Sequence, residues 1–266
     1  MPQFLNLGFT FDGISGEDVG YYIVNASSSS DNDIGLKKEI QEEDNNLTTK
    51  TFLGIKLSSF TFTIDIVKMP PHHKEYTILE ITENDINFLN NWLLKPNDYR
   101  VFSSDQNRDV FYYAMFTDMK ETRIGLKSYL TLTMRLNSGF AYSSVIHHKY
   151  NVENGLYTST ISTKSTVDDY IYPDIYLEVL KDTDTITITN VTIGESMTLT
   201  NIPKGKYICY NEDMKHIDCI SGSVTNLRPY FNNVWLRLLG NGVNHIMIEG
   251  TCEIDIYFQN KIAIQH

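Results

Sequence analysis

The chain has 266 residues, of which 41% are hydrophobic and 12% aromatic, enough to bury a sizeable core and too much for a disordered chain. This length allows one large domain or two of ordinary size, and it favours two. The net charge of −11 repels phosphate backbones and anionic lipid, so it disfavours a reader of nucleic acid and a protein of the membrane surface.

The chain opens with three glycines in the stretch FTFDGISGEDVG, residues 9–20. A phosphate-binding glycine loop must open a helix, but the aromatic and β-branched residues 21–24 that follow prefer a strand, and the stretch has no lysine to meet a phosphate. We therefore expect the glycines to turn the chain, beginning at Asp12-Gly13. The first eleven residues lack the basic segment and the long apolar run of a signal peptide.

Residues 27–50 are polar, charged and poorly periodic, as in a long loop or a mobile arm. A calcium loop needs ligands at its first, third and twelfth positions, which here would be Asp31, Asp33 and Glu42. A glycine at a ligand position and a leucine in place of the required glycine speak against calcium. We expect this segment to be ordered only by a neighbouring molecule.

Apolar and polar residues alternate with the period of a half-buried strand in several later segments. The clearest are residues 60–66, 110–116, 126–136, 186–188 and 252–258. The stretch at 241–250 fits the same pattern, with glycines supplying a turn and Ile246 and Ile248 pointing into a core. These segments predict a mostly β protein.

One segment, residues 82–96, has the period of a helix instead. Thr82 is a candidate N-cap, acidic residues follow it, and Pro96 lies beyond the end. The spacing predicts one short helix whose apolar stripe faces a sheet and whose amides face outward. The stripe consists of Ile86, Leu89 and Leu93, and the amides are Asn87, Asn90 and Asn91.

Residues 137–172 are rich in serine, threonine and asparagine, and Asn154-Gly155 within them is a turn signal. We place a domain boundary near residue 145 and expect strands to resume near Ile175.

The residues that could carry chemistry form no recognisable set. His72-His73 and His147-His148 are adjacent, and neighbours on a strand point to opposite faces, so neither pair easily grips one metal, and solvated loop histidines are the favoured interpretation. The carboxylate pairs Asp168-Asp169 and Asp182 with Asp184 lie in turn-like contexts that we expect to be solvated. We expect no catalytic, cofactor-binding or metal-binding residue.

The three cysteines, Cys209, Cys219 and Cys252, are an odd number without a CxxC pair, which favours reduced thiols in a cytoplasm. The many Tyr and Phe residues leave open a second interpretation, a sugar-stacking platform, although most of them are in phase with strand cores. Two carboxylates far apart in the sequence could also form a glycosidase, which the pattern alone does not exclude.

With the elements placed, the whole chain resembles a distal tail protein of tailed bacteriophages. The resemblance rests on FTFDGISGEDVGYYIVN, SSFTFTIDIVK, the helix ENDINFLNNWLL before DYRVF, RDVFYYAMFTD and YLTLTMRLNSGFAYS in the first half. In the second half YPDIYLEV, TITITNVTIGESMTL, GKYICYNEDMKHI and WLRLLGNGVNHIMIEGTCEIDIYF are similar to the galectin-like β-sandwich of many such proteins. Gly139 stands where the domain-closing motif often has proline, and residues 27–50 vary within the family.

The resemblance implies that residues 1–145 are an N-terminal ring-forming domain with one short α-helix, and that residues 146–266 are a galectin-like β-sandwich. It implies a homo-hexameric hub of the virion tail, assembled in the host cytoplasm, that joins the tail tube protein to the tail hub or tail-associated protein and lets DNA pass. Receptor-binding or side-fibre proteins would be further partners. No enzymatic activity, cofactor, specific nucleic-acid binding or membrane insertion is implied, and the alternative is a carbohydrate-binding module or a lectin-like adhesion protein of a tail tip. Residues 1–145 alone should form the ring, whereas residues 146–266 should stay monomeric.

Overall fold

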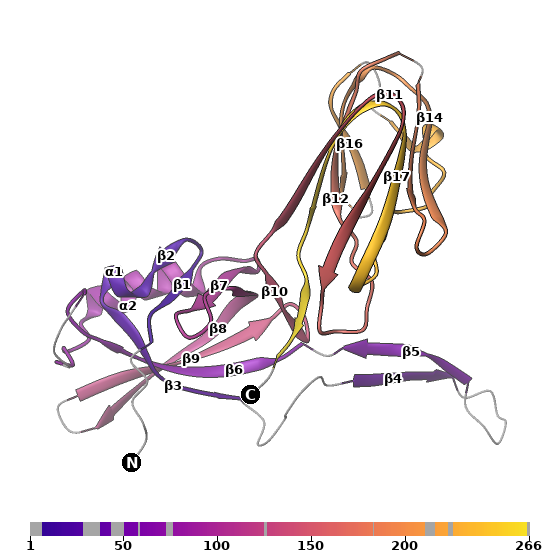
Figure 1. Cartoon of the computed structure of the whole chain (residues 1–266). Helices are drawn as coiled ribbons and strands as arrows, with labels where there is room; N and C mark the ends of the chain where they lie inside the picture. The colour runs from indigo at the N-terminus through magenta and orange to yellow at the C-terminus, as the bar shows by residue number, and fades with distance from the viewer. Residues whose placement is uncertain are drawn as a thin grey trace. The chain divides into compact units, whose positions relative to one another are not determined.

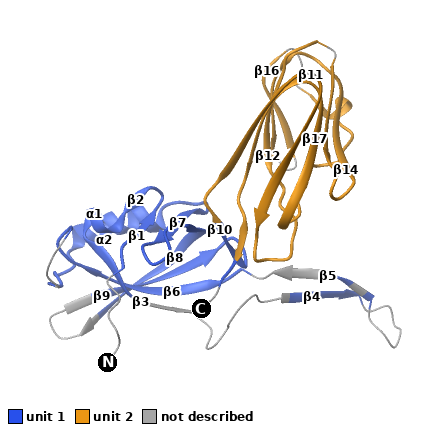
Figure 2. Cartoon of the chain, viewed as in Figure 1, with its two compact units in different colours: residues 1–142, 263–266 blue, residues 143–262 orange. Residues whose placement is uncertain are grey.

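A computed structural model describes the chain in segments (Figure 1). The described residues are 7–28, 38–43, 51–57, 59–72, 77–124, 127–182, 184–210, 216–222 and 226–264. The chain forms two compact units, one of residues 1–142 with 263–266 and one of residues 143–262 (Figure 2). Both consist mainly of strands, which confirms the predicted mostly β class.

The first unit is built on a sheet that has nine strands in the described part of the chain, and the last of them, β18, begins at residues counted with the second unit. The strands are β1 (Phe9–Phe11), β2 (Ile14–Ser15), β3 (Tyr21–Ser28), β6 (Thr61–Lys68), β7 (Arg100–Ser104), β8 (Val110–Ile124), β9 (Lys127–Leu136), β10 (Phe140–Ser143) and β18 (Lys261–Ala263). The order is β2-β1-β7-β8-β9-β6-β3, with β10 beside β8 and β18 beside β10. Strands β6, β8 and β9 confirm the predicted alternation, since Ile66, Ala114 and Leu132 are fully buried.

The opening glycines do turn the chain, as predicted, but they also enclose a helical turn that the sequence did not indicate. Asp12 and Gly13 form the turn between β1 and β2. Residues Gly16–Val19 then form α1, and Gly20 ends it in the left-handed conformation with φ 80°. A helix of four residues is too short to show a period in the sequence, and β3 begins directly after it.

The predicted helix is present and continues one turn further in a wider form. Helix α2 spans Glu83–Leu89, and the π-helical turn η1 spans Asn90–Leu94. Leu89 and Leu93 are fully buried, as predicted, whereas Ile86 is only partly buried. In a π-turn each hydrogen bond joins residues that are five apart in the sequence instead of four, and in η1 both Trp92 and Leu93 are buried.

Residues 27–50 are not a loop throughout. Strand β3 extends to Ser28, and β4 (Lys38–Glu43) pairs with β5 (Thr51–Leu57) in a two-stranded antiparallel sheet. The sequence of β4 is mostly charged and lacks an alternation of apolar residues, so the strand is recognised only by its pairing with β5. Residues 29–37 and 44–50 lie outside the described residues, and the prediction of mobility is untested there.

The second unit is a seven-stranded antiparallel sheet in the described residues. Its strands are β11 (Ile146–Lys164), β12 (Asp174–Val179), β13 (Asp184–Asn190), β14 (Glu195–Ile202), β15 (Gly205–Tyr210), β16 (His216–Ser221) and β17 (Asn241–Phe258), with the 3₁₀ turn η2 at Arg228–Tyr230. The order is β14-β13-β17-β12-β15-β16, and β11 lies along the other edge of β17. The predicted strand at 241–250 is confirmed, with Ile246 and Ile248 buried.

Strands β11 and β17 are long, paired and bent, and the sheet bends with them. Residues 246–249 of β17 pair with β13, while residues 252–257 of the same edge pair with β12. Two groups of strands, here called wings, therefore start from β17: β13 with β14, and β12 with β15 and β16. At the division, Gly155 of β11 lies opposite Gly250 beside a β-bulge. The wings cover a common core that includes Ile188 and Leu199 from one and Ile175 and Tyr207 from the other, which is the arrangement of a sandwich.

The expectation that Asn154-Gly155 is a turn and that strands resume near Ile175 is wrong. Both residues lie inside β11, which begins at Ile146. Glycine at a bulge and glycine at a turn look alike in a sequence, because both use a backbone that other residues avoid. The serine- and threonine-rich residues around them suit an exposed strand face.

Candidate functional site

The sequence contains two histidine pairs, and the structure describes three of these four residues. His147 and His148 lie in strand β11, not in a loop as expected, and they occupy opposite faces. The ring of His147 stacks on Tyr257 at 4.4 Å, and its Nε2 lies 2.6 Å from Asp255. His148 stacks on the buried Phe258 instead, and burial, followed by the neighbouring His147, lowers its pKa.

His72 lies in an exposed turn, where its Nε2 is 3.2 Å from Asp18 and its Nδ1 is 3.8 Å from Glu17. His73, Asp31 and Asp33 fall outside the described residues, and Glu42 lies in β4. No cluster of three or more His, Cys, Asp or Glu side chains that could hold a metal occurs among the described residues.

Asp168, Asp169 and Asp182 are exposed, as expected, and Asp184 is partly buried, but three of these carboxylates also bind other segments of the fold. Asp169 accepts a hydrogen bond from Lys261 Nζ at 2.8 Å. Asp182 accepts one from the backbone N–H of Lys204 at 3.1 Å, and Asp184 accepts one from the N–H of Thr251 at 2.8 Å. These carboxylates connect segments distant in the sequence, which no local pattern could indicate.

The cysteines are free thiols, as predicted. Burial raises the pKa of both Cys209 and Cys252 to about 12, so neither is a thiolate at neutral pH. Cys219 is partly exposed. The buried thiols act as small apolar side chains of the sandwich core.

In the first unit, one carboxylate joins the helix to the sheet. Asp85 accepts hydrogen bonds from the hydroxyl of Tyr21 at 2.9 Å, from Lys68 Nζ at 2.7 Å and from the backbone of Thr82 at 2.7 Å. Burial alone would raise the pKa of Asp85, but the hydrogen bonds from Lys68, Thr82 and Tyr21 together lower it well below its ordinary value. The sequence indicated Thr82 as the cap but not its partners.

The second unit has a corresponding buried amide pair. The side chain of Asn190 donates to Oδ1 of Asn244 at 2.9 Å and to the carbonyl of Arg237 at 2.9 Å. The same Oδ1 accepts from the backbone N–H of Leu239 at 2.7 Å. The alternation of β17 places Asn244 on the same buried side as Ile246, so the sequence pattern contains a signal for this residue.

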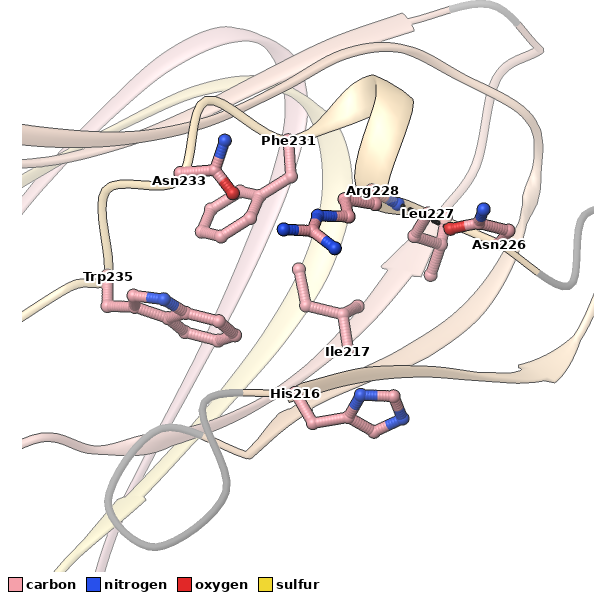
Figure 3. Close-up of a pocket in the computed structure, with 8 residues that line it drawn as sticks. All are labelled: His216, Ile217, Asn226, Leu227, Arg228, Phe231, Asn233 and Trp235. Carbon is pink, nitrogen blue, oxygen red and sulfur yellow. Dashed lines mark hydrogen bonds between the residues drawn. The ribbon is translucent and has the colours of Figure 1, made fainter.

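A pocket of about 470 Å³ lies in the second unit between strand β16 and the segment around η2 (Figure 3). It is lined by His216, Ile217, Asn226, Leu227, Arg228, Phe231, Asn233 and Trp235. The buried Leu227 and Phe231 form apolar lining, while Arg228 and both asparagines are exposed. The sequence did not indicate this pocket, because its lining comes from two segments that only the folded structure brings together.

Two family models together match most of the chain. A family model described as the phage tail protein N-terminal domain matches residues 5–138, and one described as the phage tail C-terminal domain matches residues 140–258. The chain belongs to this family of phage tail proteins. A search of curated protein sequences gave no match.

Among solved structures, this phage tail protein is similar to the Dit protein of phage SPP1, with a TM-score of 0.62 and 12% sequence identity. The match covers 96% of this chain and 98% of the SPP1 protein, which is described as a paradigm of the hub adsorption apparatus in phages that infect Gram-positive bacteria. None of the helices in the described part of the tail protein has the length and apolar character that crossing a membrane requires.

Proposed function

We propose that this tail protein is a distal tail protein, a homo-hexameric ring that joins the tail tube to the tail tip or baseplate and lets DNA pass. The observation that carries the proposal is the likeness in fold to the SPP1 hub protein over nearly the full length of both chains. Membership of a phage tail family places this fold in a virion tail. The role is assembly, without catalysis or a cofactor.

The first unit offers a surface suited to ring closure. Strands β4 and β5 pair only with each other among the described residues. Their side chains Ile40 and Leu53 are 62% and 60% exposed. An isolated two-stranded sheet is marginally stable in water, so covering these apolar side chains with a neighbouring subunit would stabilise the hairpin and the ring together.

The ring would stack on the tail tube protein on one side and on the tail hub or tail-associated protein on the other. The second unit, a galectin-like sandwich, would then lie at the periphery, within reach of receptor-binding or side-fibre proteins. The net charge of −11 suits a channel that DNA crosses without adhering, because like charges repel.

The mass of the purified full-length protein tests the proposal. We expect light scattering to find a species six times the 30.6 kDa of the single chain, alone or with the tail tube protein added. Negative-stain images should show a ring with a central opening. A monomer both alone and with the tube protein would contradict the proposal.

A further inference from the structure

The pocket between β16 and η2 has the size of a small-molecule site. Its volume of about 470 Å³ falls in the range of roughly 300–1,000 Å³ of ligand pockets. It lies entirely within the second unit and uses none of the residues that we assign to ring closure.

One wall of the pocket is aromatic. Trp235 is partly exposed, and its ring meets the ring of Phe231 edge to face, with centroids 4.8 Å apart. Phe231 is buried and holds the indole in place, so the open face of Trp235 is a rigid, flat apolar surface (Figure 3). A flat aromatic face suits the C–H face of a sugar ring.

Polar donors surround this aromatic wall. The guanidinium of Arg228 points toward the middle of the lining residues in Figure 3. Neither this guanidinium nor the side-chain amide of Asn233 has a hydrogen-bond partner within the described ranges. Oδ1 of Asn226 accepts a hydrogen bond from the backbone N–H of Arg228 at 3.1 Å, and the amide nitrogen of Asn226 has no partner in the same ranges. A planar guanidinium presents paired donors that match a carboxylate or a phosphate.

The charge of the pocket is opposite to that of the protein. None of its eight lining residues is acidic, although the whole chain carries −11. His216 also lines the pocket, with its Nε2 2.6 Å from the exposed Asp218. Arg228 has no acidic partner among the residues that the structure describes, so its charge attracts an anion to this place.

We propose that this pocket binds a saccharide that carries a phosphate or carboxylate group. The sugar ring stacks on Trp235, and Arg228 pairs with the anionic group. Asn226 and Asn233 donate to hydroxyl oxygens. The proposal concerns binding by the second unit alone and does not depend on whether the protein forms a ring.

The test begins with the full-length protein on an array of oligosaccharides that includes matched neutral, phosphorylated and uronic-acid forms. We expect binding to anionic members and weaker binding to their neutral counterparts. Titration of the best member should change tryptophan emission, and Trp235 would be the source, because Trp92 is buried in the other unit. No binding to any anionic member would overturn the proposal, and so would equal binding of neutral and anionic forms.

Variants then assign the site. Arg228→Ala should weaken binding of the best anionic member by about 10-fold or more, since charge-assisted hydrogen bonds contribute roughly 1.5–3 kcal/mol. Lys181→Ala removes one exposed positive charge elsewhere in the same unit and should leave binding unchanged. Arg228 is exposed, so removing its side chain should not unfold the protein. Trp235→Ala separately tests whether the saccharide stacks on the indole. Unchanged affinity in both pocket variants would place the saccharide elsewhere and end the proposal.

Discussion

Single buried or half-buried polar side chains hold the elements of each unit in place. In the first unit Asp85 caps its own helix and also binds Tyr21 of β3 and Lys68 of β6, so one carboxylate connects the start of the helix to two strands. In the second unit Asn190 and Asn244 connect β13 to β17. Buried polar groups that are fully paired specify one arrangement, because any other would leave them unpaired.

Asp85→Asn should destabilise the protein by about 1–3 kcal/mol at pH 7, because it removes the charge that Lys68 faces. The pKa of Asp85 is lowered in the folded state, so its contribution to stability is present above the ordinary carboxyl pKa of about 4 and is lost as the pH falls below it. Urea unfolding of both proteins at several pH values measures this, and the difference between them should shrink toward low pH. Glu83→Gln, an exposed acid of the same helical turn, is the control. A difference that does not change with pH would contradict the assignment.

At the scale of elements, two features position the rest: the helix α2 with η1 on the first sheet, and the bend in β11 and β17. The indole of Trp92 stacks on Phe9 of β1 at 5.6 Å and donates to the carbonyl of Phe11 at 3.1 Å. The bend at Gly250 lets one strand serve two wings of the sandwich. Each feature depends on close packing of a few residues.

Leu89→Ala should lower the free energy of unfolding by about 2–5 kcal/mol, because Leu89 is fully buried between helix and sheet. Chemical denaturation of the full chain, followed by a signal of the first unit such as emission from Trp92, measures it. Asn87→Ala on the exposed face of the same helix should stay within about 0.5 kcal/mol of the wild type. Equal effects of the two substitutions would mean that the helix does not pack as described.

Gly250→Ala should destabilise the second unit more than Gly194→Ala. Gly250 has φ 119°, and an added Cβ would lie 2.5 Å from Cδ1 of Ile186 and 2.9 Å from the carbonyl of Thr185. Gly194 has φ 72° with nothing within 4 Å of an added Cβ, so its substitution reports backbone strain alone. Strain of this kind costs about 1–3 kcal/mol, and the clash at Gly250 adds to it. Thermal unfolding of both variants measures the two losses of stability. A smaller loss for Gly250→Ala than for Gly194→Ala would show that the bend accommodates the added Cβ.

At the scale of the whole molecule, the two units are not simple consecutive halves. Strand β18 at the end of the chain pairs with β10, and residues 263–266 belong to the first unit. A fragment of residues 1–145 therefore lacks a strand of its own sheet. The ring is therefore to be tested first with the full chain, which contains β18, and then with residues 1–145.

Ile40→Asp in the full chain should abolish the proposed ring, because it places a charge on the exposed apolar face of the β4–β5 hairpin that a neighbour would cover. Light scattering should then find a monomer. Val191→Asp is the matched control, since Val191 is a 55% exposed apolar residue of the second unit, and it should leave the ring intact. A ring that survives Ile40→Asp but not Val191→Asp would place the contact between subunits in the second unit and contradict the proposal.

The sequence by itself determined the β class, the strands with clear alternation, the capped helix and the family, because each rests on local period, capping or an ordered series of motifs. Only the tertiary structure decided the π-turn that buries Trp92, the partners of Asp85, the pairing of the mostly charged β4 with β5, and the return of β18 to the first sheet. Asn154-Gly155 shows the reason most clearly: a glycine in a bulge and a glycine in a turn have the same local preference, and only the partner strand β17 distinguishes them. The pocket was equally invisible, because its lining comes from segments that the sheet brings together and no spacing along the chain records.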